Sequence, residues 1–354
     1  MITNNNSIKI GGKPFERGQK IGTFFKSKIE SALSIWEKHF FDINNVRLID
    51  YVEFIQKEKC FQSIIEKYAP DYLDEVKGIA ESAEISYPLL YAWQLADENY
   101  WLIESFKNNA SIEKEGCTTF GVLKENQMIL MGQNLDIPCY KNGLQTILKL
   151  DMGGMEQCIF TQAGLLGSFG CNNSGIALCV NTVAQLGHDL NGLPVSYMVR
   201  KVLESSTIDE AEDKLKSIPH ASGQNYLLGG HGKINNYECI SRQVKKIPLE
   251  ESNYICHTNH PVAKENVKLT VADSFFSSTS KDRYCQLDEF LSQNKLKSVE
   301  EIMKTMFQKP VFIDQKEPVK GIATFHMAYF ILDQDTQAFY FDLNGNAENF
   351  LKIL

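Results

Sequence analysis

Excess positive charge, long apolar runs and internal repeats are all missing from this chain of 354 residues. Its 36 lysines and arginines are outnumbered by 44 aspartates and glutamates, so the formal net charge is -8. This balance argues against a nucleic-acid partner, because phosphate binding needs a basic face. No apolar run approaches the roughly 20 residues that cross a bilayer, so no membrane association is predicted. The first residues, MITNNNSIKIGGKP, lack a charged segment followed by an apolar core, and we expect no signal peptide.

Disulfide bonds and metal clusters are not predicted either. The nine cysteines are odd in number, and their spacing does not suggest disulfide pairs. A chain of this length can bury a core without disulfide bonds. We therefore expect reduced thiols and a cytoplasmic location. The stretch CHTNH contains His257 and His260, but in an extended strand residues three apart point their rings to opposite faces. No metal site is predicted there.

The first third of the chain has the apolar spacing of amphipathic helices. Between residues 14 and 41 a stripe of apolar residues recurs at every third or fourth position, namely Ile21, Phe25, Ile29, Ala32, Trp36 and Phe40. A second stripe lies in PDYLDEVKGIAESAEIS (70–86), where Asp71 is a candidate N-cap. A further apolar stretch, 89–103, precedes the polar segment ESFKNNASIEKEG (104–116), which we interpret as an exposed linker.

After Gly116 the pattern changes to strands. CTTFGVL and MILMGQNLD flank the polar turn KENQ, which predicts a β-hairpin over residues 117–136. More β-rich runs follow, and helices return near 193–204, after Thr207 and after Ser298. Thr207 and Ser298 each stand three residues before a glutamate, the spacing of a capping box. This order predicts an α+β protein with largely antiparallel sheets and helices outside them.

Cys117 stands at the start of the first predicted strand after the linker, directly behind Gly116. A thiol attacks as a thiolate, and at an ordinary pKa only a few per cent is ionised near neutral pH. A cut between Gly116 and Cys117 would give Cys117 an α-amine with a pKa of roughly 8, able to act as base for its own thiol. A glycine before the nucleophile accepts the strained backbone that an N-to-S acyl shift requires. The residues thus allow a self-processed N-terminal nucleophile.

Two other interpretations of the same residues stay open. The first is a conventional thiol peptidase that uses a histidine such as His257 or His260, and it predicts activity from an uncut chain. The second is a catalytically silent protein that stays uncut and binds a ligand or partner. The mass of the purified protein identifies self-processing, which alone predicts two fragments. An intact chain with activity would favour the peptidase, and an intact inactive chain would favour the binding protein.

Several blocks of the sequence resemble the isopenicillin N acyltransferase family, also described as acyl-coenzyme A:6-aminopenicillanic acid acyltransferases. GCTTF followed by MGQNLD resembles the start of the mature large subunit of these N-terminal-nucleophile hydrolases, which cut themselves at a Gly-Cys bond. The resemblance continues in GLLGSFGCNNSGIALCVNTV, in residues 192–228 and in HTNH, and it includes PDYLDEVKGIAESAEI near the start. It therefore covers most of the chain.

By this resemblance, Cys117 matches the nucleophile and Gly116 the residue on the other side of the cut bond. Asp136 matches an aspartate that helps to position the nucleophile's amine, and Asn259 matches the asparagine whose amide stabilises the oxyanion. The residues expected to line the site are Thr118, Asn134, Asn225 and, by a looser match, Ser241. The sequence departs from the family at Leu135, where a tryptophan is typical.

The resemblance implies a four-layer αββα fold made as one precursor. A small helical chain, 1–116, and a large chain, 117–354, would stay packed together as one domain after the cut. The expected enzyme breaks the amide bond of a small N-acyl compound through a Cys117 thioester, which water or an acceptor amine resolves. No metal or redox cofactor is implied, and coenzyme A enters only as a thioester co-substrate. The penicillin substrate of the fungal members does not transfer, because no motif places the side chains that bind it.

Overall fold

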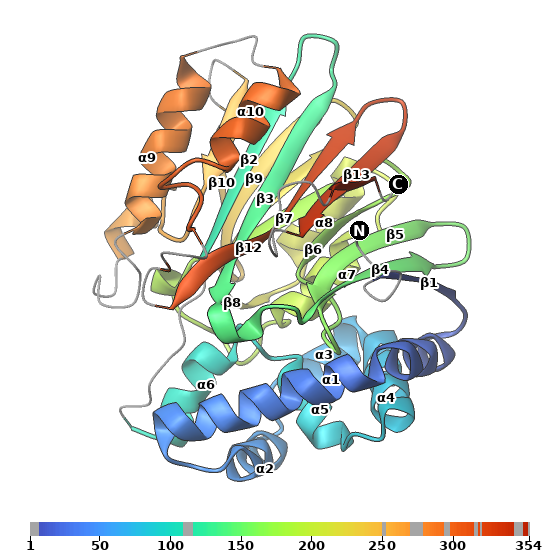
Figure 1. Cartoon of the computed structure of the whole chain (residues 1–354). Coiled ribbons are helices and arrows are strands. Elements are labelled where there is room, and N and C mark those ends of the chain that lie inside the picture. The colour runs from blue at the N-terminus through green and yellow to red at the C-terminus, as the bar shows by residue number, and fades with distance from the viewer. Residues whose placement is uncertain are drawn as a thin grey trace.

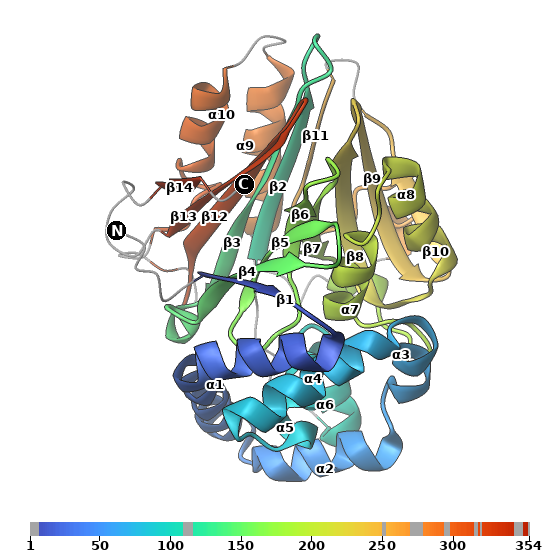
Figure 2. The ribbon, with the colours of Figure 1, turned by 90° about the vertical axis from the view of Figure 1, so that its right-hand side faces the viewer.

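In the computed structural model, two β-sheets lie face to face and helices cover both outer faces of this sandwich, as Figures 1 and 2 show from two sides. The structure describes residues 7–108, 116–249, 253–269, 279–293, 298–314, 318, 321–342 and 350–352. Three large apolar clusters fill the spaces between successive layers: helices and sheet, sheet and sheet, sheet and helices. The predicted α+β, four-layer αββα arrangement is therefore confirmed.

The six-stranded sheet contains the predicted hairpin. Its order is β11 (Tyr254–His257), β2 (Gly116–Leu123), β3 (Ile129–Pro138), β12 (Ile322–Leu332), β13 (Thr336–Asp342) and β14 (Phe350–Lys352). All described neighbours in it pair antiparallel. Helices α9 (Thr279–Ser292) and α10 (Val299–Met306) cover the outer face of this sheet. Their apolar residues share one cluster with Phe120 and Leu130 of the hairpin.

The eight-stranded sheet is built from both halves of the chain. Its order is β1 (Ser7–Gly11), β4 (Gln145–Asp151), β5 (Glu156–Gln162), β6 (Phe169–Asn172), β7 (Ala177–Thr182), β8 (His220–Gly230), β9 (Lys233–Ser241) and β10 (Gln243–Ile247). β1 pairs with β4 in parallel, whereas the other neighbours pair antiparallel as predicted. Residues before 116 thus supply an edge strand to a sheet made otherwise of residues after 116.

Helices account for most of the first third of the chain. They are α1 (Pro14–Asn44), α2 (Leu48–Glu58), α3 (Gln62–Tyr68), α4 (Pro70–Ala83), α5 (Tyr87–Trp93) and α6 (Asn99–Phe106). Every residue of the stripe predicted for 14–41 is buried. A Cβ on Gly18 would lie 2.0 Å from the carbonyl oxygen of Glu75, and one on Gly78 would lie 2.1 Å from that of Phe15. Only glycine lets α1 and α4 pack this closely.

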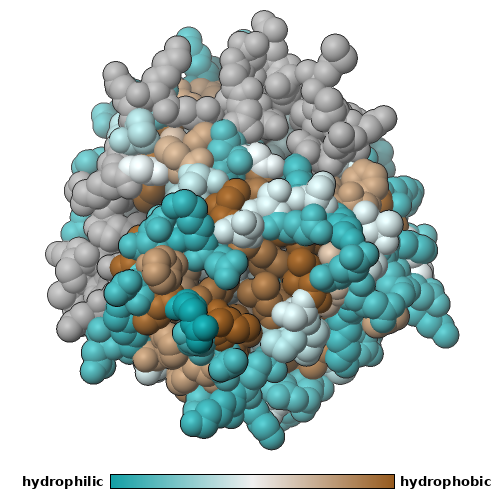
Figure 3. All heavy atoms as spheres, turned by 60° about the horizontal axis from the view of Figure 1, so that its bottom comes forward, coloured by the Kyte–Doolittle hydropathy of each residue, from teal (hydrophilic) through white to brown (hydrophobic). Residues whose placement is uncertain are grey.

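This helical part forms one end of the molecule (Figure 1) and joins the outer layer of the eight-stranded sheet beside α7 (Val195–Val202) and α8 (Ile208–Ser217). Figure 3 looks onto that end and shows hydrophobic residues in a hollow bordered by hydrophilic ones. Large apolar side chains such as Phe24 and Phe41 remain exposed on α1. Within the described residues, none of the helices has both the length and the apolar character needed to span a membrane.

A buried ion cluster ties the helical part to α7. The Glu75 carboxylate on α4 accepts hydrogen bonds from Arg17 Nε (2.7 Å) on α1 and from Arg200 Nη1 (2.7 Å) on α7. Burial alone would raise the pKa of Glu75, but the two guanidinium groups, Arg200 first, outweigh it and hold the pKa below its ordinary value. A charge removed from this cluster leaves others uncompensated in the core.

Two local predictions are wrong. Asp71 does not cap α4, because the N-cap is Ala69 and Pro70 begins the helix, which places Asp71 inside the first turn. The segment 104–116 is not a linker throughout, because α6 continues to Phe106. Residues 109–115 of that segment lie outside the described part of the chain.

The two predicted helix starts after Thr207 and Ser298 are confirmed. The hydroxyl of Thr207 accepts a hydrogen bond from the backbone of Glu210, and that of Ser298 accepts one from Glu301. The capping box is complete only at Ser298, because the Glu210 carboxylate bonds to the backbone of Ser206 instead.

Candidate active site

The β2–β3 hairpin determines which side chains reach the space between the sheets. Cys117 pairs with Leu135, and Gly116 pairs with Asp136. Since side chains alternate along a strand, Cys117 and Leu135 face the pocket described below, while Gly116 and Asp136 face Arg283 on α9. The bond expected to be cut therefore starts β2, with the thiol on one face of the sheet and a carboxylate on the other.

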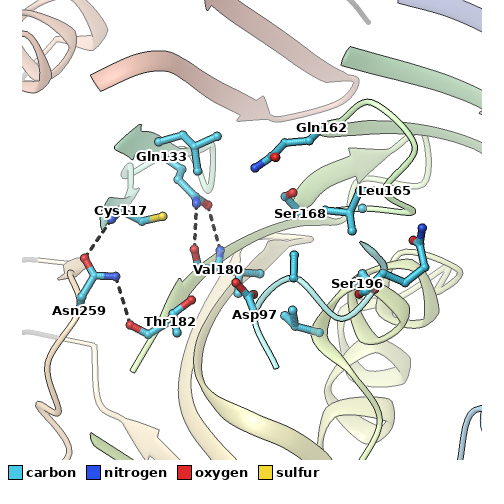
Figure 4. Close-up of a pocket in the computed structure, with 15 residues that line it drawn as sticks. Asp97, Cys117, Gln133, Gln162, Leu165, Ser168, Val180, Thr182, Ser196 and Asn259 are labelled. Carbon is cyan, nitrogen blue, oxygen red and sulfur yellow. Dashed lines mark hydrogen bonds between the residues drawn. The ribbon is translucent and has the colours of Figure 1, made fainter. Parts of the chain in front are cut away.

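A pocket with an empty volume of about 620 Å³, its open mouth included, lies beside Cys117. Figure 4 shows the side chains that line it. The wall combines the turn after α5 with the ends of β2, β3, β5 and β7 and the start of α7. Gln94, Ala96 and Asp97 of this wall come from the region before the expected cut. The pocket is complete only when both parts of the chain are present.

The helical part also holds the loop that follows β5. Trp93 Nε1 donates to the carbonyl of Ala163 (3.0 Å), and Gln94 Nε2 donates to that of Gly164 (2.7 Å). The backbone N–H of Leu166 donates back to Gln94 Oε1 (2.9 Å). These buried hydrogen bonds fix the loop after β5, which forms part of the pocket wall, against residues that precede the expected cut.

Asn259 is bonded to the backbone of Cys117. The N–H of Cys117 donates to Asn259 Oδ1 (2.9 Å), and Asn259 Nδ2 donates to the carbonyl of Thr182 (3.1 Å), as Figure 4 shows. The backbone N–H of Asn259 donates to the hydroxyl of Ser280 on α9 (2.9 Å). These contacts fix the orientation of the Asn259 amide next to the nitrogen of the bond expected to be cut.

Arg283, on α9, was not predicted from the sequence. Its Nη1 donates to the carbonyl of Cys117 (2.6 Å) and to the hydroxyl of Thr118 (2.7 Å), and its Nη2 donates to Asn259 Oδ1 (2.9 Å). Arg283 is 1% exposed. Its guanidinium fork thus holds the Cys117 backbone and Asn259 in one geometry.

A sequence signal for Arg283 exists. It occupies a position in the buried stripe Ser280, Arg283, Leu287 and Leu291 of α9, which has the spacing of a core-facing helix side. An arginine within such a stripe has to find buried acceptors, because a fully buried charge is costly unless it is paired. The arginine at position 283 could therefore have predicted that α9 packs against buried polar groups.

Asp136 lies on the Gly116 side of the bond expected to be cut. Its Oδ1 accepts a hydrogen bond from the hydroxyl of Thr324 (2.6 Å), and its Oδ2 lies 3.5 Å from Arg283 Nη1. A Cβ on Gly116 would lie 3.1 Å from the same Oδ2, which shows how close the carboxylate is to this residue. Burial raises the pKa of Asp136, although Arg283 and Thr324 act in the opposite direction.

The four residues expected to line the site lie elsewhere. Thr118 and Asn134 face α9 and α10, where Asn134 Nδ2 donates to the carbonyl of Met306 (2.9 Å). Asn225, on β8, is buried and donates to Asn236 Oδ1 (2.7 Å). The hydroxyl of Ser241, at the end of β9, donates to Asp189. The described pocket lining includes none of the four. The pleat turns Thr118 and Asn134 away, whereas Asn225 bonds to the neighbouring strand β9 and Ser241 to Asp189.

The histidines of the HTNH stretch are engaged away from the thiol. His257 contacts the Glu238 carboxylate through Nε2 (3.0 Å) and the carbonyl of Thr258 through Nδ1 (2.7 Å). His260 Nδ1 lies 2.8 Å from the hydroxyl of Ser280, and burial lowers the pKa of His260 to about 4. Neither ring is among the described pocket residues. In the described part of the chain, no group of three or more histidine, cysteine or carboxylate side chains is placed to hold a metal.

Glu98 is a buried carboxylic acid behind the pocket wall. It accepts hydrogen bonds from the Ser222 hydroxyl (2.7 Å) and the Val195 backbone (3.1 Å), and within the described residues its Oε2 has no hydrogen-bond partner. Burial raises the pKa of Glu98 to about 7. Folding therefore keeps this group neutral at pH values where the unfolded chain ionises it.

A stability measurement against pH tests this state of Glu98. The stability that a raised carboxyl pKa gives is complete below pH 4.5 and is lost as the pH rises to about 7. We expect Glu98→Gln to abolish this loss, which amounts to about 3 kcal/mol at 1.36 kcal/mol per unit. Melting curves between pH 4 and 8 measure it, with the exposed Glu265→Gln as control. Parallel curves for the wild type and Glu98→Gln would contradict the expectation.

The sequence is similar to known proteins, and this similarity identifies the family of the chain. The family model described as acyl-coenzyme A:6-aminopenicillanic acid acyl-transferase matches residues 122–346, more than half of the chain, so the chain belongs to this family of acyl-transferring enzymes. Among individual relatives, it is 26% identical over 260 residues to the 40 kDa form of acyl-coenzyme A:6-aminopenicillanic-acid-acyltransferase from Emericella nidulans. This match covers 72% of the present chain and 68% of the relative.

Two solved structures are more distantly similar. One is the Caenorhabditis elegans orthologue of N-acylethanolamine-hydrolyzing acid amidase, with 15% identity, a TM-score of 0.47, and coverage of 62% of this chain and 98% of that one. The other is penicillin V acylase from Agrobacterium tumefaciens, with 14% identity, a TM-score of 0.45, and coverage of 67% and 86%.

Proposed function

We propose that the chain cuts itself between Gly116 and Cys117 and then acts as an N-terminal-cysteine hydrolase or acyltransferase on the amide bond of a small N-acyl compound. The observation that carries this proposal is the 2.9 Å hydrogen bond from the Cys117 backbone nitrogen to Asn259, beside a pocket that Cys117 itself lines. Membership of an acyltransferase family supports the class of reaction.

The cut needs no group from outside the site except water. The Cys117 thiol attacks the carbonyl carbon of Gly116, and the C–N bond breaks as the Cys117 nitrogen takes a proton. Water then hydrolyses the thioester, which leaves a carboxylate on Gly116 and both a thiol and an α-amine on Cys117. Arg283 holds the carbonyl of Cys117 and Asn259 its nitrogen, so both are positioned before the bond breaks.

Turnover uses the same thiol with its new amine. The amine takes the thiol proton, the thiolate attacks the substrate's amide carbonyl, and the leaving amine departs with a proton. Asn259 Nδ2 has two hydrogens and donates one to Thr182, so the second serves the oxyanion. Water or an acceptor amine then resolves the Cys117 thioester. A coenzyme A thioester is an alternative acyl donor, because it forms the same intermediate.

Asp136 assists on the Gly116 side. Before the cut it balances the Arg283 charge. After the cut the new Gly116 carboxylate lies close to both Asp136 and Arg283, so the Arg283 guanidinium then faces two carboxylates. The nitrogen of Cys117 stays bonded to Asn259, so Asn259 positions the amine directly while Asp136 acts through Arg283 and charge.

The small chain, 1–116, and the large chain, 117–354, stay together in this proposal. The small chain contributes β1 to the eight-stranded sheet and Arg17 and Glu75 to the buried ion cluster with Arg200. It also contributes Gln94, Ala96 and Asp97 to the pocket. The two chains thus share a sheet, a core and a binding site.

The mass of freshly purified, denatured protein tests the proposal. The wild type should give two species of about 13 and 27 kDa, which divide 40.2 kDa in proportion to residues 1–116 and 117–354. Cys117→Ala should stay whole and should release no amine from N-acyl amides, because the nucleophile of both steps is gone. Cys285→Ala, which removes an exposed thiol on α9, is the matched control and should be cut normally. A whole wild-type chain that turns over substrate would sink the proposal.

A further inference from the structure

The loop that carries Asn259 is held on both sides of that residue by one buried carboxylate. Glu238, on β9 of the eight-stranded sheet, is 0% exposed. Its Oε1 lies 3.0 Å from His257 Nε2, at the end of β11. The same oxygen accepts hydrogen bonds from the backbone N–H groups of Val262 and Ala263 (3.1 Å from Ala263). Asn259 therefore stands in the sequence between two points that Glu238 fixes.

The second oxygen of Glu238 is engaged as well. Asn266 Nδ2 donates to Glu238 Oε2 (2.8 Å), and both side chains are buried. Burial alone would raise the pKa of Glu238, but the contact with His257 and the hydrogen bonds from Val262 and Asn266 outweigh it and hold the pKa below its ordinary value. The carboxylate thus stays ionised and accepts hydrogen bonds from the loop on both of its oxygens.

Helix α9 holds the same loop from another layer. The Thr258 hydroxyl donates to the carbonyl of Ser280 (2.9 Å), and the backbone N–H of Asn259 donates to the Ser280 hydroxyl (2.9 Å). Glu238 reaches the loop from the eight-stranded sheet, whereas Ser280 reaches it from the helix that covers the six-stranded sheet. Fixed from both layers, the Asn259 amide turns its Oδ1 to the Cys117 nitrogen, as Figure 4 shows.

We infer that Glu238 is a positioning residue that sets the place of Asn259 beside Cys117, although the described pocket lining does not include it. Its effect on the reaction rests on the proposed function, in which the Asn259 amide serves the oxyanion. A misplacement of about 1 Å that originates far from the chemistry can cost roughly a hundredfold in rate. Glu238 would thus act on the reaction through Asn259.

Hydrogen exchange in the uncut Cys117→Ala protein tests the position of Asn259 without any turnover. The backbone N–H of residue 117 donates to Asn259 Oδ1, so its exchange rate reports this contact. Glu238→Ala removes the acceptor on both sides of Asn259, and we expect the amide of residue 117 to exchange about tenfold faster. The amide of Leu123, at the other end of β2, donates to the carbonyl of Asn253 (2.8 Å) and should keep its rate.

Two matched variants separate the position of the loop from a general loss of stability. Glu238→Gln keeps an oxygen for the N–H groups of the loop, and its amide can donate to Asn266 Oδ1, which has no hydrogen-bond partner within the described residues. It should retain slow exchange at residue 117. Glu212→Ala removes a carboxylate of α8 that accepts from Asn235 Nδ2 (3.0 Å), also on β9, and it should leave both amides unchanged.

The rate of self-cleavage connects the position of Asn259 to the chemistry. In chains that keep Cys117, time courses of fragment formation compare the wild type with Glu238→Ala, Asn259→Ala and the double variant. Glu238→Ala should be cut about a hundredfold more slowly than the wild type, and Glu238→Gln within about threefold of it. The double variant should be cut within about threefold of the Asn259→Ala rate, because two residues that act through one contact are not additive.

The outcomes distinguish the role of Glu238 from the proposed function. Unchanged exchange at residue 117 in Glu238→Ala would overturn the inference. Equal acceleration at residues 117 and 123 would also overturn it, and so would rate losses that multiply in the double variant. If residue 117 alone exchanges faster but the wild-type chain is never cut, Glu238 positions Asn259 and the proposed chemistry is wrong.

Discussion

Glu75→Ala is expected to lower the free energy of unfolding by about 3–5 kcal/mol, because breaking a buried ion pair leaves an uncompensated charge in the core. Here both Arg17 and Arg200 would lose their carboxylate. Since Arg17 and Arg200 belong to different sides of the proposed cut, the same change should let the small chain dissociate from the large one. Denaturant unfolding of the uncut Cys117→Ala background measures the first effect, and size-exclusion chromatography of the cut protein measures the second.

The control for this prediction is Glu81→Ala, on the same helix. Glu81 is exposed, and its carboxylate bonds to Gln19 at the surface, so we expect a change of less than about 1 kcal/mol. A Glu75→Ala protein as stable as the control, with both chains still co-eluting, would show that the cluster does not hold the two parts together.

Arg283→Met is expected to reduce both self-cleavage and amide turnover by about a hundredfold to a thousandfold, comparable to the effect of losing a preorganised hydrogen-bond donor at an active site. Arg283 fixes the carbonyl of Cys117 and the orientation of Asn259, and its loss also leaves Asp136 buried without its counter-charge. Time courses of fragment formation and of amine release measure the two activities.

A folding defect has to be separated from a chemical one in this variant. The double variant Arg283→Met, Asp136→Asn removes both charges together, so it should recover most of the lost stability while it remains uncut. Lys281→Met, an exposed change on the same helix, should behave as the wild type. If Arg283→Met were cut at the wild-type rate, the structural contacts of Arg283 would have no role in the reaction.

The fold could be predicted from the sequence where the local pattern and the burial agree. The apolar stripe of α1 and the polar turn between β2 and β3 gave the helical part and the hairpin, and both are present. Four of the described strands were not predicted, namely β1, β6, β10 and β14. β1, β10 and β14 are edge strands, and β6 has only four residues, so their patterns are short or polar. β10 contains Lys245 and Lys246. Lysines on an edge strand hinder pairing with another chain, and they also remove the apolar pattern by which a strand is predicted.

The site was predicted less completely than the fold. Cys117, Asp136 and Asn259 do lie together, although their catalytic roles remain predictions. Thr118 and Asn134 were expected at the pocket because they are close to Cys117 in sequence, but the strand pleat turns them to the other face. Arg283 was missed because it meets the site across 166 residues of chain, and no local pattern records such a contact.

The long-range hydrogen bonds to Cys117 make the proposed self-cleavage depend on correct folding. Asn259 and Arg283 reach the Cys117 backbone only after the six-stranded sheet and α9 have assembled, and Asn259 is oriented by the carbonyl of Thr182 in the eight-stranded sheet. A chain that is misfolded in any of these layers cannot organise the scission, and so it never gains its chain-starting amine. In the proposed mechanism, only molecules that have already folded correctly are cut, and so only correctly folded molecules become active.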